Sequence, residues 1–172
     1  MMDRGDRPER RWLSRIAHLV FRFVRPMTLG VRAVVLDDSG RVFLVRHTYV
    51  PGWHLPGGGV EAGETLVQAI AKELSEEANI RLTGPVQLHG VFHNSHASVR
   101  DHVAVYVVRD FVQDGPRQPD HEIAETGFFP LDAVPAATTR GTRARLNEVT
   151  NGLARSETWE PDMTRLGPGV KA

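Results

Sequence analysis

Apolar residues recur every three or four positions in three segments of the chain, and this period predicts amphipathic helices. The first segment spans residues 10–26, where the proline at 26 ends it, the second spans 65–78 and the third 142–153. Each apolar stripe needs a surface to pack against. The stripes are, in chain order, Trp12, Ile16, Leu19, Val20, Phe23 and Val24; Leu66, Ala69, Ile70 and Leu74; and Leu146, Val149 and Leu153.

Runs rich in valine and aromatic residues lie between these segments and predict strands. Residues 29–36 and 41–46 flank an Asp-Asp-Ser-Gly turn, which predicts a β-hairpin, and further strands are expected at 86–92, 102–111 and 127–131. The fold class is therefore α/β with a mixed sheet. We expect one domain over residues 27–155, a basic amphipathic helix at 1–26 and a polar, loosely held tail at 156–172.

Charge is balanced over the whole chain but not along it. With 21 Lys and Arg against 21 Asp and Glu, the formal net charge is zero, which gives no indication of nucleic-acid binding. Residues 1–26 hold seven arginines and three acids, or +4, so the rest of the chain carries −4. The chain has no cysteine, which excludes disulfides and thiolate chemistry and fits a cytoplasmic location.

Three interpretations of the 10–26 segment remain open. Its apolar stripe can pack on the main domain, pair with a second copy in a homodimer, or lie on a membrane surface with its arginines toward anionic lipid. The pattern alone does not separate these.

Three carboxylates crowd one turn of the 65–78 helix. Glu73, Glu76 and Glu77 are spaced three and four apart, so they share a face and repel one another. A hard divalent cation with oxygen ligands removes this repulsion, and Mg²⁺ takes carboxylates together with substrate phosphate. The glycine run just upstream lets the backbone approach such an ion, so the predicted ligands are the Gly57 carbonyl and these three glutamates, with Mg²⁺ expected and Mn²⁺ as an alternative.

The stretch from Gly58 to Ile80 resembles the Nudix box, Gly-x5-Glu-x7-Arg-Glu-U-x-Glu-Glu-x-Gly-U, where U is a bulky aliphatic residue. The spacing is complete, and all four box glutamates are present: Glu64, Glu73, Glu76 and Glu77. Two positions differ from the pattern. Lys72 replaces the arginine, which keeps the charge but loses the bidentate geometry. Asn79 replaces the closing glycine, and asparagine is the next most tolerant residue for a left-handed helix end.

The resemblance implies a Nudix-type α/β/α sandwich that hydrolyses a nucleoside diphosphate linked to another group, by attack of water on a phosphoanhydride. It implies metal ligands in the box, with Glu64 and Lys72 in supporting roles. The general base is expected to be Glu73, Glu76 or a glutamate from a later loop, for which Glu122 is the first choice and Glu125 the reserve.

The substrate class stays open at the level of sequence. Trp53 is a candidate to stack on a base or to be core, and Arg46 and Arg32 are candidates to meet phosphate. Marks of the ADP-ribose and diadenosine polyphosphate subfamilies are missing, which leaves a nucleoside triphosphate or a nucleotide-sugar. The spacing of the histidines at 89, 93, 96 and 102 matches no usual zinc pattern. The alternative function is a nucleotide-sensing module without turnover, suggested by Lys72.

Overall fold

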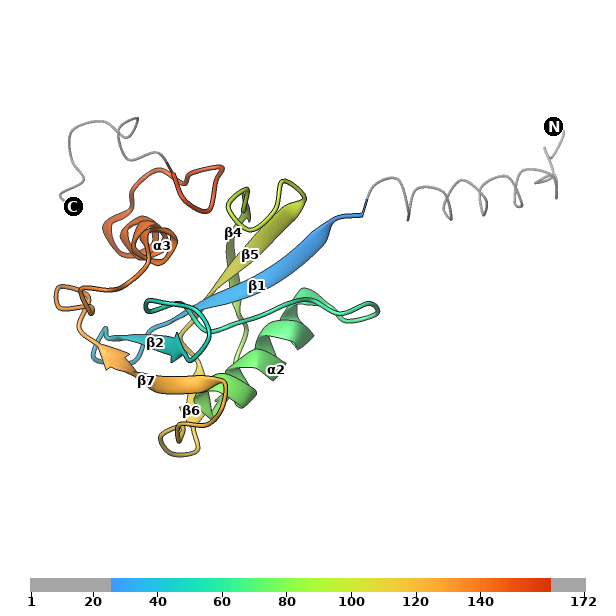
Figure 1. The fold of residues 1–172 in the computed structure, drawn as a ribbon. Coiled ribbons are helices and arrows are strands. Elements are labelled where there is room, and N and C mark those ends of the chain that lie inside the picture. The colour runs from blue at the N-terminus through green and yellow to red at the C-terminus, as the bar shows by residue number, and fades with distance from the viewer. Residues whose placement is uncertain (1–25, 162–172) are drawn as a thin grey trace, which may run out of the picture.

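Strand β1 (Thr28–Val35) is the first strand of the computed structural model, which describes residues 26–161 (Figure 1). It pairs in parallel with β5 (Asp101–Val108) over its full length. On the other side of β5, β4 (Gln87–His93) runs antiparallel, with a bulge between Leu88 and Gly90. The sheet is therefore mixed, as the sequence predicts.

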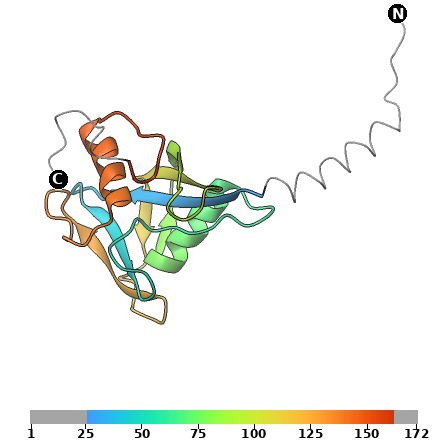
Figure 2. The ribbon, with the colours of Figure 1, turned by 45° about the horizontal axis from the view of Figure 1, so that its top comes forward.

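Two shorter antiparallel pairs complete the strands. β2 (Val42–His47) pairs with β7 (Ile123–Phe129), and β3 (Ile80–Leu82) pairs with β6 (Phe111–Gln113). Helix α2 (Leu66–Ala78) and helix α3 (Arg140–Asn151) lie on opposite sides of the sheet (Figure 2).

Alternation along the strands explains the two helical layers, because successive side chains point to opposite faces. In β1, Val31, Ala33 and Val35 belong to the core cluster under α2, whereas Val34 belongs to the cluster under α3. All four are fully buried. Burial on both faces is typical of a strand between two helices, and the expected α/β/α sandwich is confirmed.

The caps of α2 follow from its sequence. Thr65 is the N-cap and forms a capping box with Gln68, each side chain accepting from the other's backbone N–H. At the other end Asn79 adopts the left-handed conformation with φ 52°, and its N–H donates to the carbonyl of Leu74. The prediction that asparagine replaces glycine there without breaking the helix end is confirmed. Helix α3 lies two residues earlier than predicted, between Thr139 and Gly152.

The predicted hairpin is wrong. The turn forms, with Asp37 accepting from the N–H groups of Ser39 and Arg41. Beyond the single bridge between Leu36 and Val42, however, β1 and β2 separate, and each pairs with a strand from later in the chain. Local turn chemistry fixes the reversal but not the partner of each strand.

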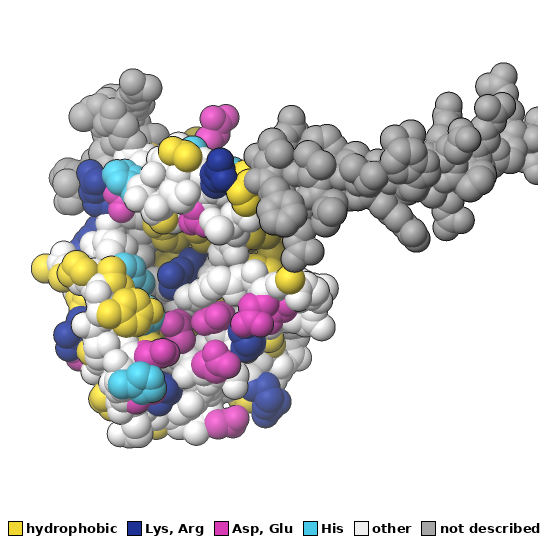
Figure 3. Space-filling model, turned by 45° about the vertical axis from the view of Figure 1, so that its right-hand side comes forward, with side chains coloured by type: hydrophobic (Ala, Val, Ile, Leu, Met, Phe, Trp, Pro, Cys, Tyr) yellow, Lys and Arg dark blue, Asp and Glu magenta, His cyan; other side chains and the backbone are white. Residues whose placement is uncertain are grey.

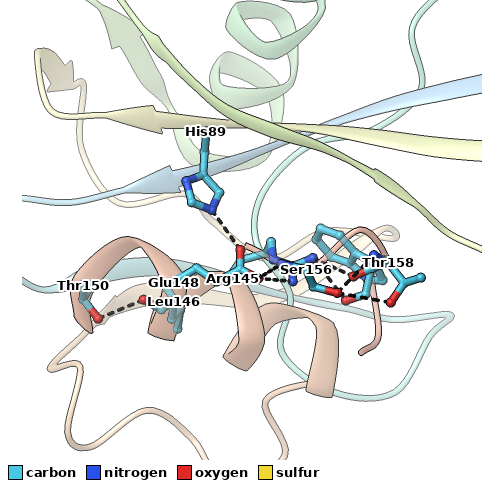
Figure 4. A network of polar contacts seen from close by, with 8 residues as sticks. His89, Arg145, Leu146, Glu148, Thr150, Ser156 and Thr158 are labelled. Atoms are coloured by element: carbon cyan, nitrogen blue, oxygen red, sulfur yellow. Dashed lines mark hydrogen bonds and ion pairs between the residues drawn. The ribbon is translucent and has the colours of Figure 1, made fainter. Parts of the chain in front are cut away.

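The prediction of a loose tail is wrong for residues 156–161. His93 donates to Glu157 and accepts from Trp159, which attaches this segment to the edge of β4. Within α3, Arg145, which has no exposed surface, forms an ion pair with Glu148 at 2.6 Å, and Arg145 also donates to the carbonyls of Thr158 and Trp159, which attaches the segment to the helix. Glu148 also accepts from His89 at 2.9 Å and from the N–H of Ser156 (Figure 4). Backbone groups of the segment thus complete the hydrogen bonds of a buried ion pair.

Residues 1–25 and 162–172 lie outside the described part, and with them the predicted N-terminal helix and the rest of the tail. Neither helix within residues 26–161 is long and apolar enough to cross a membrane. The homodimer, the membrane contact and the cytoplasmic location all stay predictions.

Candidate active site

Glu77 lies in the C-terminal half of α2, and the glycine loop holds its side chain. The N–H of Gly57 donates to its carboxylate at 2.7 Å, and Nε2 of His47 lies 3.6 Å from the other oxygen. The Glu77 side chain is only 12% exposed. Burial raises the pKa of Glu77 to about 7, against its ordinary value of 4.5, although the bond from Gly57 acts in the opposite direction. The same burial lowers the pKa of His47 to about 4, so this imidazole is neutral near pH 7.

Glu73 lies one turn earlier on the same edge, directly against Gly58. A Cβ atom on Gly58 would stand 2.5 Å from Oε1 of Glu73, so only glycine leaves room for this carboxylate. Burial, followed by the charge of Glu76, raises the pKa of Glu73. Glu76 itself is exposed, and its backbone carbonyl accepts from Arg117.

We expect Gly58→Ala to lower kcat about tenfold or more while leaving the free energy of unfolding within about 1 kcal/mol of the original. The new methyl group would displace the Glu73 carboxylate, which supplies the three nearest atoms and lies at the end of a flexible side chain. Steady-state kinetics and urea unfolding measure the two quantities. In the control Gly59→Ala, the added Cβ meets nothing within 4 Å, and an equal loss of activity there would refute this explanation.

Lys72 is engaged on the outer side of the loop. Its ammonium lies 3.2 Å from Glu61 and 3.3 Å from Glu64, and Glu64 in turn accepts from the N–H of Glu61. That N–H bond is the main cause of the lowered pKa of Glu64. Lys72 therefore fixes the loop that carries Glu64 and makes no ion pair with Glu73 or Glu77.

A basic and aromatic group lies above the acidic edge. Arg32 donates to the carbonyl of Leu55 at 2.9 Å, and it lies close enough to the two buried glutamates, His47, His54 and Tyr49 to influence the pKa of each. Figure 3 shows acidic side chains gathered below a hollow that holds a basic side chain, with histidine beside it. The face thus offers carboxylates for a cation next to a guanidinium for an anion.

The donor set suits a hard divalent ion. The half-buried Glu73 and the nearly buried Glu77 are carboxylates with raised pKa values, and a cation would relieve the cost of charging them. The carbonyls of Pro56 and Gly58 accept from β1, so the carbonyl between them, that of Gly57, is directed away from that strand. Within residues 26–161, no three histidine, aspartate or glutamate side chains converge on one point as they stand. The ligand set of Gly57, Glu73, Glu76 and Glu77 therefore stays a prediction.

Comparison with known proteins decides the family. The family model for the NUDIX domain matches residues 26–148, which is most of the chain. The chain belongs to the Nudix hydrolase family. In a solved structure, the MutT Nudix hydrolase from Burkholderia pseudomallei is 29% identical, with a TM-score of 0.63; the match covers 72% of this chain and 98% of that one.

Two curated relatives carry different substrate names. A Bacillus subtilis (strain 168) protein, provisionally named an 8-oxo-dGTP diphosphatase, is 27% identical over 127 residues, 73% of this chain and 81% of that protein. An RNA pyrophosphohydrolase from Legionella pneumophila (strain Corby) is 39% identical over 62 residues, 36% of this chain and 35% of that protein. The second match spans about a third of its relative.

The structure places Trp53 in the core, which is one of the two alternatives that the sequence leaves open. This side chain is only 7% exposed and packs edge-to-face on Phe129 at 4.8 Å, within the cluster under α3. The loop that leads to the Nudix box runs back beside β2 and pairs with Thr138, which turns Trp53 into the core. It offers no face to a nucleotide base.

Of the other candidates, Arg46 and Glu125 lie away from the box glutamates, whereas Glu122 lies near them. Arg46 contacts Glu125 at 2.9 Å and lies over Trp53, so neither Arg46 nor Glu125 is directed at the box glutamates. Glu122 lies at the start of β7, where its carbonyl accepts from Thr48, and its charge acts on the pKa of Glu77. Of the two loop glutamates, Glu122 is the one beside the site.

Sequence reasoning missed His47. It continues the alternation of Phe43 and Val45 along β2, both of which pack under α2. A register shift between Arg46 and His47 in the pairing with β7 marks the point where this row of side chains passes from core to site. The alternation along β2 could have identified it: after Phe43 and Val45, His47 is the next side chain on the face that packs under α2, where the glutamates lie.

Proposed function

We propose that this Nudix hydrolase cleaves a phosphoanhydride bond in a nucleoside diphosphate linked to another group, with Mg²⁺ as cofactor and Mn²⁺ as a substitute. The observation that carries the proposal is the pair of carboxylates, the half-buried Glu73 and the nearly buried Glu77, held against Gly57 and Gly58. Among the described residues, no lysine or arginine forms an ion pair with either of them. Folding alone gains nothing from such a pair.

The residues divide into those that hold a cation and those that hold the substrate. Glu73, Glu76, Glu77 and the carbonyl of Gly57 would bind the metal, which supplies positive charge against phosphate oxygens and makes water more acidic. Lys72 and Glu64 stabilise the loop that faces this group. Arg32 would donate to the phosphate from the opposite side, since guanidinium geometry suits phosphate oxygens.

One carboxylate must take a proton from the attacking water. Glu73 and Glu76 are candidates on α2, and Glu122 is the candidate from the loop just before β7. Glu73 has the raised pKa that favours a general base working near neutral pH. Comparing the pH profiles of Glu73→Gln, Glu76→Gln and Glu122→Gln would assign the role.

The nucleoside part of the substrate has room beside β2. A cavity of about 490 Å³ is lined by the residues from Arg46 to Gly52, and Tyr49 within it is 73% exposed. An exposed aromatic ring next to Arg32 suits a base stacked beyond a bound phosphate. Together with the relative named for 8-oxo-dGTP, this favours a nucleoside triphosphate, with a nucleotide-sugar as the second candidate.

A panel of nucleoside triphosphates, nucleotide-sugars and dinucleotides tests this proposal. Products would be identified by phosphorus NMR in ¹⁸O-labelled water with Mg²⁺, because the phosphorus attacked is the one in the product that carries the labelled oxygen. Turnover of one class would support the proposal. Tight binding of a nucleotide without turnover, with either Mg²⁺ or Mn²⁺, would overturn it and favour the sensing module.

We expect Mg²⁺ to raise the melting temperature by several degrees at about pH 8 and by much less at about pH 5.5. The Glu77 carboxyl has a pKa of about 7 in the folded protein, so below that value a proton competes with the ion. Differential scanning fluorimetry with and without millimolar Mg²⁺ measures both shifts. A shift of equal size at both pH values would show that Glu77 is not a ligand.

A further inference from the structure

An exposed apolar patch lies where the described chain begins. Met27 is 61% exposed, Leu29 37%, Val91 50% and Val99 78%. The N–H of Thr28 donates to the carbonyl of Arg100, which brings the start of β1 beside the loop that contains Val99. We call these four apolar residues the β1–β4 patch.

The strand register places Leu29 and Val91 on the same face of the sheet, with the half-buried His102 and His93 beside Leu29. Leu29 in β1 is opposite His102 in β5, and His102 is opposite His93 in β4, so the three form one row across the sheet. Side chains two positions along lie on the same face. The next row is therefore Val31, Ala104 and Val91.

Helix α2 covers only part of this second row. Val31 and Ala104 have no exposed surface and belong to the cluster under α2, whereas half of Val91 is exposed. Helices packed on a sheet lie about 10 Å apart, which is about two strand spacings. The exposed side of β4 at Val91 thus lies where a second helix next to α2 would pack.

The sequence before the patch carries a matching apolar surface. Residues 10–25 repeat apolar side chains at helical spacing and connect to the patch through Pro26 alone. As a helix these sixteen residues would be about 24 Å long, enough to cross the three strands of the sheet. Proline at the end of the segment stops a helix and allows the chain to reverse.

The distribution of charge also favours contact between the N-terminal segment and the rest of its own chain. Residues 1–26 carry +4, and the rest of the chain carries −4. One acidic residue borders the patch: Asp101, which accepts from the Thr28 hydroxyl. Arg15, Arg22 and Arg25 lie between the apolar positions of the segment, where they would meet such a border.

We propose that residues 10–25 fold back as an amphipathic helix onto the β1–β4 patch of their own chain. The segment then forms a second helix on the α2 face and shields an apolar area next to the loop of the Nudix box. This role is independent of the substrate and of catalytic competence, so it stands even if the chain proves to be a sensing module.

Because the natural chain has no cysteine, pairs of introduced cysteines report the contact directly. Val91→Cys would be combined in turn with Ile16→Cys, Leu19→Cys and Phe23→Cys in the full chain and oxidised at low protein concentration. We expect at least one pair to form an intramolecular disulfide at least tenfold faster than its control. The control pairs the same N-terminal cysteine with Val112→Cys, an exposed position on β6.

Three outcomes would overturn the proposal. Disulfide-linked dimers would place the segment on a second copy, equal rates for Val91 and Val112 pairs would show no preferred site, and absence of any cross-link would show no contact. Hydrogen exchange supplies the second measurement: residues 10–25 should be protected in the natural chain and exchange at least tenfold faster in Val91→Asp. Protection that persists in Val91→Asp, or that appears only with anionic vesicles, would also refute it.

Discussion

Glu77→Gln should lower kcat/KM about 100-fold or more and at the same time stabilise the metal-free protein near pH 8. The loss of activity follows from removing a metal ligand. The gain in stability follows because the natural carboxylate is charged at that pH within a nearly buried site, while glutamine is neutral and can still accept from the N–H of Gly57.

The sign and the pH window of the gain come from the shifted pKa. Glu77 has a pKa of about 7 when folded, above its ordinary value of 4.5, so the folded state binds the proton more tightly. The natural protein therefore loses stability as pH rises from about 4.5 to about 7, by at most roughly 3 kcal/mol, and the glutamine variant does not. Urea unfolding across this range, with chelator present, measures the difference.

Glu125→Gln is the matched control for Glu77→Gln. It also removes one carboxylate, but from an exposed position on β7 that pairs with Arg46. We expect its activity to stay within about twofold and its stability to fall slightly, by less than about 1 kcal/mol. If Glu77→Gln keeps its activity, or if both variants gain stability alike, Glu77 is an ordinary buried acid and has no catalytic role.

Among glycine-to-alanine substitutions in the glycine loop, Gly57→Ala should be the most destabilising, and it should lower the free energy of unfolding by about 4 kcal/mol or more. Gly57 has φ +138°, a region that side chains rarely adopt. Its Cβ would also stand 2.1 Å from the carbonyl oxygen of Val31, in β1. The loop would have to leave β1, and the N–H bond to Glu77 would be lost with it.

Thermal and urea unfolding of Gly57→Ala, compared with Gly59→Ala, test that expectation. Gly59 shares the same run, but its Cβ would meet nothing within 4 Å and its φ lies outside the left-handed region. The two variants add the same atom two residues apart. Equal stability of the two variants would contradict the close approach of the loop to β1.

The site was predictable wherever spacing along one element decides geometry. Glu73, Glu76 and Glu77 share a helical face because the helix repeats every 3.6 residues, and Asn79 ends that helix as its residue type suggests. The same local signals predicted the start of α2 to within one residue of its observed position. Nothing from outside the helix was needed for these conclusions.

Prediction failed, or left alternatives open, where a partner distant in the sequence decides. Trp53 is core because its loop runs between β2 and Thr138, and β1 pairs with β5, some 70 residues later. The segment 156–161 packs because the buried ion pair of Arg145 and Glu148 needs further hydrogen-bond partners, and the backbone of this segment supplies them. Hydrophobic periodicity and turn chemistry act over a few residues, so they do not predict which distant strand or loop packs beside a given element.

The most direct test of the central claim is hydrolysis rate against Mg²⁺ concentration, for the natural chain and for Glu76→Gln, on whichever nucleotide the panel identifies. Glu76 is exposed on α2, so its replacement should leave the fold intact. We predict that the natural chain is inactive with chelator and reaches a plateau with added Mg²⁺, while Glu76→Gln stays about 100-fold below that plateau. Equal rates with chelator and with Mg²⁺, or full activity in Glu76→Gln, would contradict the account.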